Sequence, residues 1–178
     1  MAKRSRLLAL LLLLTCGAVI VEFANHRSTS GILVETNRAG EINVQWPVAD
    51  GLTGRMLLNL KSNQPLIRSF GFSKPDGTIQ PIMESVDPVM ALTIGERDPV
   101  KAAAAYQQMV FFENPRERPH HTYPVQLTKN RVTVTNNGSR TTLIIGDAVA
   151  GSFKGDFRLT FYRNSPLVRA EYVLTTDE

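Results

Sequence analysis

A polar segment at residues 113–123 carries the densest set of side chains that could do chemistry. It holds Glu113, His120, His121 and Tyr123 among several prolines. Histidines beside carboxylates can ligate a metal or exchange protons. Adjacent histidines point to opposite faces of an extended chain, however, and no His-x-x-x-His pair is present. This spacing favours a solvated, proline-stiffened loop, and the alternative is that these four residues contact a polar ligand such as a sugar. No metal site is predicted.

The sequence offers few signs of nucleophilic catalysis. It has no Gly-x-Ser-x-Gly motif, and its single cysteine, Cys16, lies near the amino end. The glycine-containing segment 51–54 is too short for a phosphate-binding loop and predicts a turn. Asp147 and Asp156 could form the carboxylate pair of a glycoside hydrolase, but both border glycines and are predicted to lie in turns. The catalytic residues are thus unknown, and no cofactor is predicted.

Trp46 and the tyrosines could form an aromatic platform on which a sugar stacks. Trp46 shares one face of a predicted strand with Ile42 and Val44, because residues two apart lie on the same side of a strand. This pattern favours a place in the hydrophobic core.

Residues 1–27 are predicted to be an export signal or an N-terminal membrane anchor. A basic start is followed by an apolar run at residues 7–21 that carries no charge. As a helix this run would span about 22 Å, less than the roughly 30 Å of a bilayer's hydrocarbon core, which favours a cleaved signal. A cut is expected after Ala18 or after Ala24, each with an imperfect cleavage motif.

Cys16 adds a third interpretation of this segment. The sequence Leu-Leu-Thr-Cys-Gly at residues 13–17 resembles a bacterial lipoprotein box, which makes Cys16 a candidate for lipidation. It departs from the box in having Thr15 before the cysteine, and the alternative is that Cys16 is one apolar residue of the signal. All three interpretations predict an exported protein, whether periplasmic, extracellular or envelope-anchored. Membrane contact is expected only through residues 7–21, if they are uncleaved or lipidated.

Composition and charge exclude several classes of protein. With 43% hydrophobic and 20% charged residues, the chain of 178 residues has a globular composition, neither disordered nor collagen-like. A single cysteine excludes a disulfide scaffold. The formal net charge is +4, but the basic residues are scattered, without the cluster that nucleic acids require. Nucleic-acid binding is therefore not expected.

The rest of the chain alternates short apolar segments with turn residues. Apolar residues at every second position predict strands, and Pro75-Asp76-Gly77 and Asn137-Gly138 predict hairpin turns. The predicted strands include residues 41–46, 66–72, 78–83, 89–94, 131–135, 141–145, 157–161 and 168–174. One short helix is predicted at residues 98–109. Residues 28–178 are therefore predicted to form a mainly β domain, an antiparallel β-sandwich of about nine to eleven strands with one short helix.

The last predicted strand runs almost to Glu178. It is expected either at the edge of a sheet or in a chain that continues further. The domain at residues 28–178 is thus either complete or an incomplete part of a larger domain.

The carboxyl-terminal half resembles a known family. Residues 142–147 and 151–167, which end in a Tyr-x-x-Ser-Pro-Leu turn, are similar to a hairpin in galactose-mutarotase-like (supersandwich) domains. The segments 111–113 and 119–120 also look like exported planctomycete-type bacterial proteins that carry such domains. The resemblance covers about residues 89–178 and implies carbohydrate handling. Complete domains of that family are longer, so it also implies that catalytic residues lie beyond Glu178, and none is carried over.

Two functions from different classes are expected. The first is an exported non-catalytic β-sandwich module with a structural or carbohydrate-interaction role in the cell envelope. Its partner would be a polysaccharide or another envelope protein. The second is the N-terminal part of a secreted carbohydrate-active enzyme of the epimerase or polysaccharide lyase type.

Overall fold

The computed structural model describes residues 20–24, 30–37, 40–95 and 120–176. These residues form twelve strands, and the only helical element among them is a single 3-10 turn, η1 (Ala49–Gly51). The strands are β1 (Ile20–Ala24), β2 (Leu33–Thr36), β3 (Glu41–Pro47), β4 (Thr53–Asn59), β5 (Ile67–Ser73), β6 (Ile79–Val86), β7 (Ala91–Gly95), β8 (His120–Pro124), β9 (Gln126–Asn137), β10 (Arg140–Ala150), β11 (Phe153–Tyr162) and β12 (Val168–Thr175).

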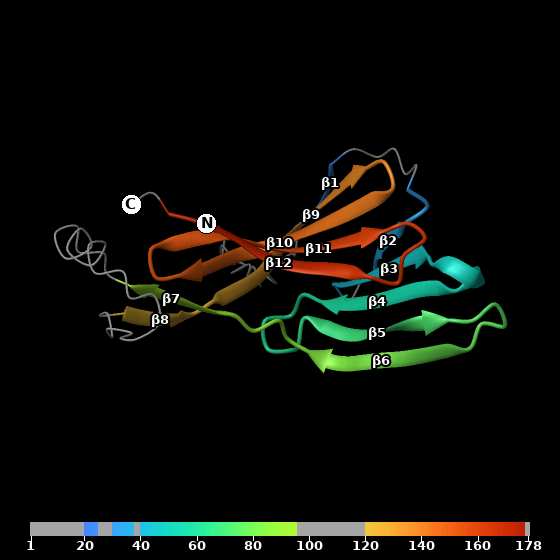
Figure 1. Ribbon diagram of the computed structural model, residues 1–178, viewed down its shortest axis with the longest axis horizontal. Helices are drawn as coiled ribbons and strands as arrows, with labels where there is room; N and C mark the ends of the chain where they lie inside the picture. The colour runs from blue at the N-terminus through green and yellow to red at the C-terminus, as the bar shows by residue number, and fades with distance from the viewer. Residues whose placement is uncertain (1–19, 25–29, 38–39, 96–119, 177–178) are drawn as a thin grey trace, which may run out of the picture.

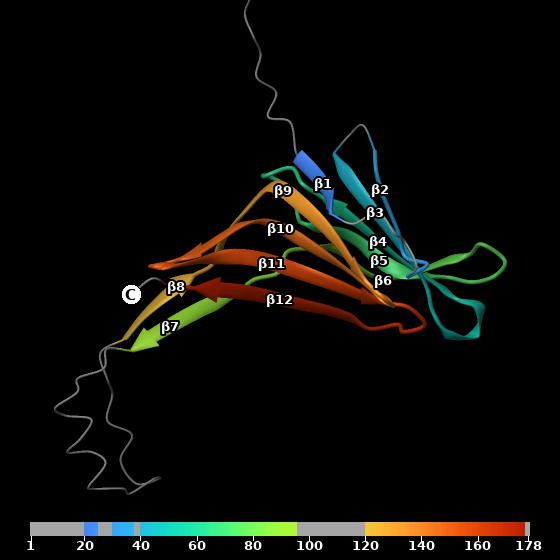
Figure 2. The same ribbon diagram turned by 90° about the horizontal axis from the view of Figure 1, so that it is seen from above.

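Two five-stranded sheets form the body of the molecule (Figure 1). Sheet A has the strand order β1-β9-β10-β11-β12, and sheet B has the order β2-β3-β4-β5-β6. Strands β7 and β8 form a separate hairpin that extends away from sheet B (Figures 1 and 2). All neighbouring strands are antiparallel except β1 and β9. The prediction of a mainly antiparallel β-sandwich is confirmed.

Both predicted hairpin turns are present. Strands β5 and β6 flank the Pro75-Asp76-Gly77 turn, in which Gly77 has a φ of 84° and Asp76 Oδ1 accepts a hydrogen bond from the Thr78 backbone at 2.8 Å. Strands β9 and β10 pair Asn137 directly with Arg140. Gly138 therefore opens the two-residue loop, and its φ of 59° is the left-handed conformation that glycine adopts at little cost.

The core lies between sheets A and B. Its buried apolar side chains come from both sheets, because each strand alternates between a core face and an outer face. The largest fully buried side chains are Trp46, Phe157, Phe161, Ile42, Leu58, Leu66, Leu143, Ile145, Leu159, Val44, Val132 and Val134.

Trp46 of β3 connects the two sheets. Its side chain is 1% exposed, and its Nε1 donates a 2.9 Å hydrogen bond to the backbone oxygen of Ser165, which lies between β11 and β12. The ring centroids of Trp46 and Phe161 of sheet A are 4.9 Å apart, and those of Trp46 and Phe70 of sheet B are 6.0 Å apart. The expectation that Trp46 packs in the core is confirmed, and its polar end is paired, as a buried indole requires.

Gly54 of β4 leaves room for the indole. It is the cross-strand partner of Trp46, and a Cβ at this position would lie 2.2 Å from Trp46 Cε2. The segment 51–54, expected as one turn, is divided between two elements. Gly51 ends η1, whereas Gly54 lies inside β4, because the indole occupies the space that a side chain would need.

Strand β1 lies inside the segment predicted to be an export signal or anchor. It pairs in parallel with β9, with Ile20 beside Arg131 and Ala24 beside Thr135. A cut after Ala24 would remove β1 from sheet A, whereas a cut after Ala18 would leave it in place.

Two further expectations concern the middle and the end of the chain. The helix predicted at residues 98–109 lies outside the described residues. Strand β12 forms an edge of sheet A among the described residues, and whether the domain continues stays a prediction. In the part of the chain that the structure describes, no helix has the length and apolar character needed to cross a membrane.

Replacing Gly54 by alanine tests the packing of Trp46. The added methyl group would overlap the indole ring, so we expect Gly54→Ala to lower the free energy of unfolding by about 3 kcal/mol. Urea denaturation measures this change. The neighbouring outward-facing Thr53 offers a control, and Thr53→Ala is expected to change the free energy by about 0.5 kcal/mol or less. Equal stability of the two variants would contradict this account of the core.

Candidate functional site

The outer face of sheet B carries several half-buried polar side chains. Ile42, Val44 and Trp46 of β3 face the core, so Asn43 and Gln45 point to the opposite side of the sheet. Strand pairing extends this face across all five strands. One cross-strand row consists of Glu35, Asn43, Leu57, Ser69 and Glu84, and the next consists of Leu33, Gln45, Arg55, Gly71 and Pro81.

A bulge in the pairing of β5 with β6 raises one side of this face. The register shifts between Phe70 and Gly71. A Cβ on Gly71 would lie 2.4 Å from the backbone oxygen of Gln80 and 2.9 Å from Cα of Pro81, so the backbone of β6 passes close over β5. Pro81 and the exposed Ile79 thereby form a wall along this side of the face.

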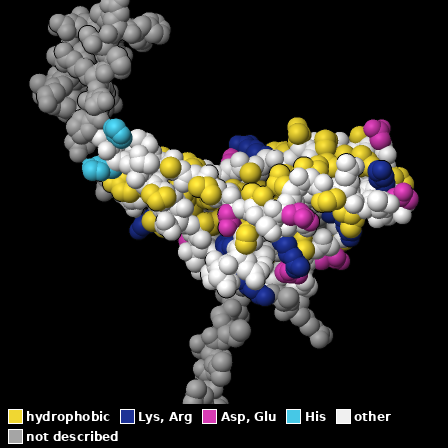
Figure 3. All heavy atoms as spheres, turned by 90° about the horizontal axis from the view of Figure 1, so that it is seen from below, with side chains coloured by type: hydrophobic (Ala, Val, Ile, Leu, Met, Phe, Trp, Pro, Cys, Tyr) yellow, Lys and Arg dark blue, Asp and Glu magenta, His cyan; other side chains and the backbone are white. Residues whose placement is uncertain are grey.

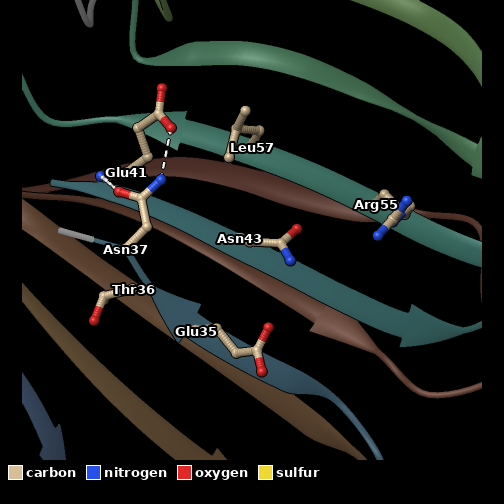
Figure 4. A pocket seen from close by; sticks show the side chains of 7 residues that line it. All are labelled: Glu35, Thr36, Asn37, Glu41, Asn43, Arg55 and Leu57. Atoms are coloured by element: carbon tan, nitrogen blue, oxygen red, sulfur yellow. Dashed lines mark hydrogen bonds between the residues drawn. The ribbon is translucent and has the colours of Figure 1, made fainter. Parts of the chain in front are cut away.

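Polar side chains at the β2–β3 hairpin form a second boundary. Asn37 Nδ2 donates to Glu41 Oε2 at 2.8 Å, and the Glu41 backbone N–H donates to Asn37 Oδ1 at 3.0 Å (Figure 4). Arg68 of β5 donates to the other carboxylate oxygen of Glu41. The hydrogen bonds from Asn37 and then Arg68 hold the pKa of Glu41 below its ordinary value. This boundary is therefore fixed by its own internal contacts.

Two adjoining hollows of about 780 and 420 Å³ lie between these boundaries. Asn43, Arg55 and Leu57 line both of them, so the hollows form one groove, which we call the sheet B groove. Figure 4 shows Glu35 on β2, Asn43 on β3, and Arg55 and Leu57 on β4, the strands that line the larger hollow.

The central polar side chains of the groove are unpaired. Asn43 and Arg55 are half-buried and Glu35 is exposed. Within the described ranges, none of these three side chains makes a hydrogen bond or an ion pair. The Glu35 carboxylate can accept hydrogen bonds, the Arg55 guanidinium can donate them, and the Asn43 amide can do either. The apolar side chain of Leu57 lies beside them.

The predicted ligand residues lie elsewhere. His120 and His121 are exposed on β8, and Tyr123 is half-buried on the same strand. The ring centroids of His121 and Tyr123 are 6.2 Å apart, and Figure 3 shows the histidines at one end of the molecule. Glu113 and the lipidation candidate Cys16 lie outside the described residues. The prediction that these side chains bind a polar ligand stays a prediction.

In the described portion of the chain, no group of three or more histidine, cysteine, aspartate or glutamate side chains could hold a metal ion.

The expectation that Asp147 and Asp156 lie in turns is wrong. Asp147 lies in β10 and is paired with Arg131 at 2.9 Å, and Asp156 lies in β11. Gly146, with a φ of 60°, marks a bulge in β10. At Gly155 a Cβ would lie 1.8 Å from the backbone oxygen of Val173. Gly146 thus permits a bulge within a strand, and Gly155 permits the close approach of a neighbouring strand; neither lies in a turn.

Sequence reasoning did not single out the groove residues. Asn43 stands between the apolar residues Ile42 and Val44, and this alternation predicts an outward position on a strand. The signal does not say which outward residues of different strands become neighbours, because that depends on the register between strands.

Comparison with known proteins gave no relative. No family model, curated protein or solved structure matches this chain. The resemblance to galactose-mutarotase-like domains stays a prediction.

The lowered pKa of Glu41 predicts a pH dependence of stability. Because the folded state holds this pKa below its unfolded value, the carboxylate stabilises the fold at neutral pH. That contribution is lost as the pH falls below about 4.3 and through the lowered pKa. We therefore expect the difference in Tm between wild type and Glu41→Gln to be largest near neutral pH and to shrink in acid.

Thermal unfolding across this pH range measures the difference. Glu35→Gln is the matched control, since the Glu35 side chain makes no ion pair with the described residues. A Tm difference for Glu41→Gln that stays constant as the pH falls would show that the contacts with Asn37 and Arg68 do not stabilise the fold.

Proposed function

We propose that this protein is an exported, non-catalytic β-sandwich module that binds carbohydrate in the cell envelope, and that the sheet B groove is its binding surface. The observation that carries the proposal is the set of unpaired polar side chains, Glu35, Asn43 and Arg55, held on three adjacent strands beside Leu57.

The chemistry of the groove suits a polyhydroxyl ligand. Each sugar hydroxyl both donates and accepts, so it can pair with the Glu35 carboxylate, the Arg55 guanidinium or the Asn43 amide. The apolar C–H faces of a sugar ring can lie on Leu57.

The charges of the groove favour a neutral ligand. Glu41 is already paired with Arg68, which leaves Arg55 together with Glu35 and Glu84 as the unpaired charged side chains that line the two hollows. A strongly anionic ligand would meet the two carboxylates, and a strongly cationic one would meet the guanidinium. A neutral polysaccharide is not repelled by either kind of charge.

The position of the groove fits a binding module. It runs across all five strands of sheet B, a distance of about 19 Å at the usual strand spacing, and is open at the surface. An extended glycan chain could therefore lie along it. The sequence pattern of residues 1–27, which predicts export, supports a location where such glycans occur.

Substitutions in the groove test this proposal. Isothermal titration with soluble oligosaccharides of glucose, galactose, mannose and N-acetylglucosamine is expected to find a ligand. Arg55→Ala should weaken its binding about tenfold or more, because a charged hydrogen-bond donor is lost. Asn43→Ala should weaken it about fivefold. Neither variant should unfold the protein, since these side chains have no partner among the described residues.

Two controls separate the groove from other surfaces. Arg131→Ala removes an exposed arginine from sheet A and should leave binding unchanged. His120→Ala and His121→Ala should also leave it unchanged. Loss of binding in the histidine variants, with full binding in Arg55→Ala, would place the site on the β7–β8 hairpin and contradict the proposal. Release of new reducing ends from the oligosaccharides would instead favour an enzyme.

A further inference from the structure

We infer that the sheet B groove selects glycans that carry an apolar substituent, such as an acyl or alkyl group, over unsubstituted sugars. This inference rests on the proposed function and names the ligand class of the same groove. It depends on the two ends of the groove having different chemistry.

One end of the groove is polar. Glu35, Asn43 and Arg55 lie on β2, β3 and β4, and Glu41, which is paired with Arg68 of β5, lines the same hollow. These side chains provide the unpaired donors and acceptors, so the hydroxylated part of a ligand is expected here.

The other end carries an apolar wall. Where β6 passes close over β5, Pro81 and Ile79 line the smaller hollow together with Leu57 and Gly71. Ser69 and Glu84 line this hollow as well, so its apolar surface is the part formed by Pro81, Ile79 and Leu57. Ile79 is 52% exposed. A sugar hydroxyl placed here would have no hydrogen-bond partner on Pro81, Ile79 or Leu57, whereas an alkyl group would be removed from water.

The two ends are close enough for one ligand. Arg55 and Pro81 lie in the same cross-strand row and are separated only by Gly71, so two strand spacings, about 10 Å, lie between them. A short chain attached to a sugar bound at Arg55 can therefore reach the wall.

Matched glycosides test the inference. Isothermal titration compares the methyl and octyl glycosides of glucose, galactose, mannose and N-acetylglucosamine, with the octyl compounds kept below their micelle concentrations. We expect the octyl form of the preferred sugar to bind about tenfold more tightly, which corresponds to burial of about two methylene groups.

A variant of the wall locates the effect. Ile79→Ser should remove the advantage of the octyl form and leave the affinity for the methyl form unchanged. Leu33→Ser is the matched control. Leu33 is similarly exposed, at 48%, but it lies on β2, the edge strand opposite β6. This control should keep the octyl advantage.

The outcomes distinguish the two proposals. Equal affinity for methyl and octyl forms would overturn this inference and leave the proposed function standing. An octyl advantage that survives Ile79→Ser would also overturn it, since the chain would then lie elsewhere. Absence of binding to every glycoside would overturn the proposed function and this inference together.

Discussion

The hydrogen bond from the Trp46 indole to the backbone oxygen of Ser165 links sheet B directly to sheet A. It fastens the turn between β11 and β12 of sheet A onto β3 of sheet B, and the backbone N–H of Asn164 adds a second link by donating to Pro47 at 2.8 Å. The indole also needs the space left by Gly54. The packing of Trp46 therefore depends on β3, on β4 and on the turn between β11 and β12. Aromatic pairing with Phe161 adds about 0.5–1.5 kcal/mol to the apolar burial.

This arrangement decides which side of sheet B is free for function. Since the core takes the face with Ile42, Val44 and Trp46, the face with Asn43 and Arg55 must look outward. Polar side chains on such a face usually meet water and pair with one another. Here Glu41 pairs with Asn37 and Arg68, while Asn43 and Arg55 keep their donors and acceptors free of partners among the described residues. That difference is what makes the groove a better candidate site than the outer face of sheet A, where Arg131, Arg158 and Arg169 are each paired with a carboxylate.

The fold could be predicted from local patterns, but the candidate site could not. Alternation in β3 and the glycines at 77 and 138 were enough to predict strands, hairpins and the burial of Trp46. The groove depends on how five strands align and on the bulge at Gly71, which are set by contacts between distant segments. The same limit explains the error at Asp147 and Asp156. A glycine beside an aspartate is typical of a turn. Gly146 instead lies at a bulge, and Gly155 lies where a Cβ would overlap the backbone of β12. Neither contact can be recognised from the local sequence.

Mapping the bound ligand by nuclear magnetic resonance would test the central claim, that the outer face of sheet B is the binding surface. The protein, labelled with nitrogen-15, is titrated with the tightest-binding oligosaccharide while its amide and arginine side-chain signals are followed. The account predicts that the largest shifts fall on β2, β3 and β4 and on the Arg55 guanidinium, with β7 and β8 unchanged. Shifts confined to the β7–β8 hairpin, or to sheet A, would contradict it.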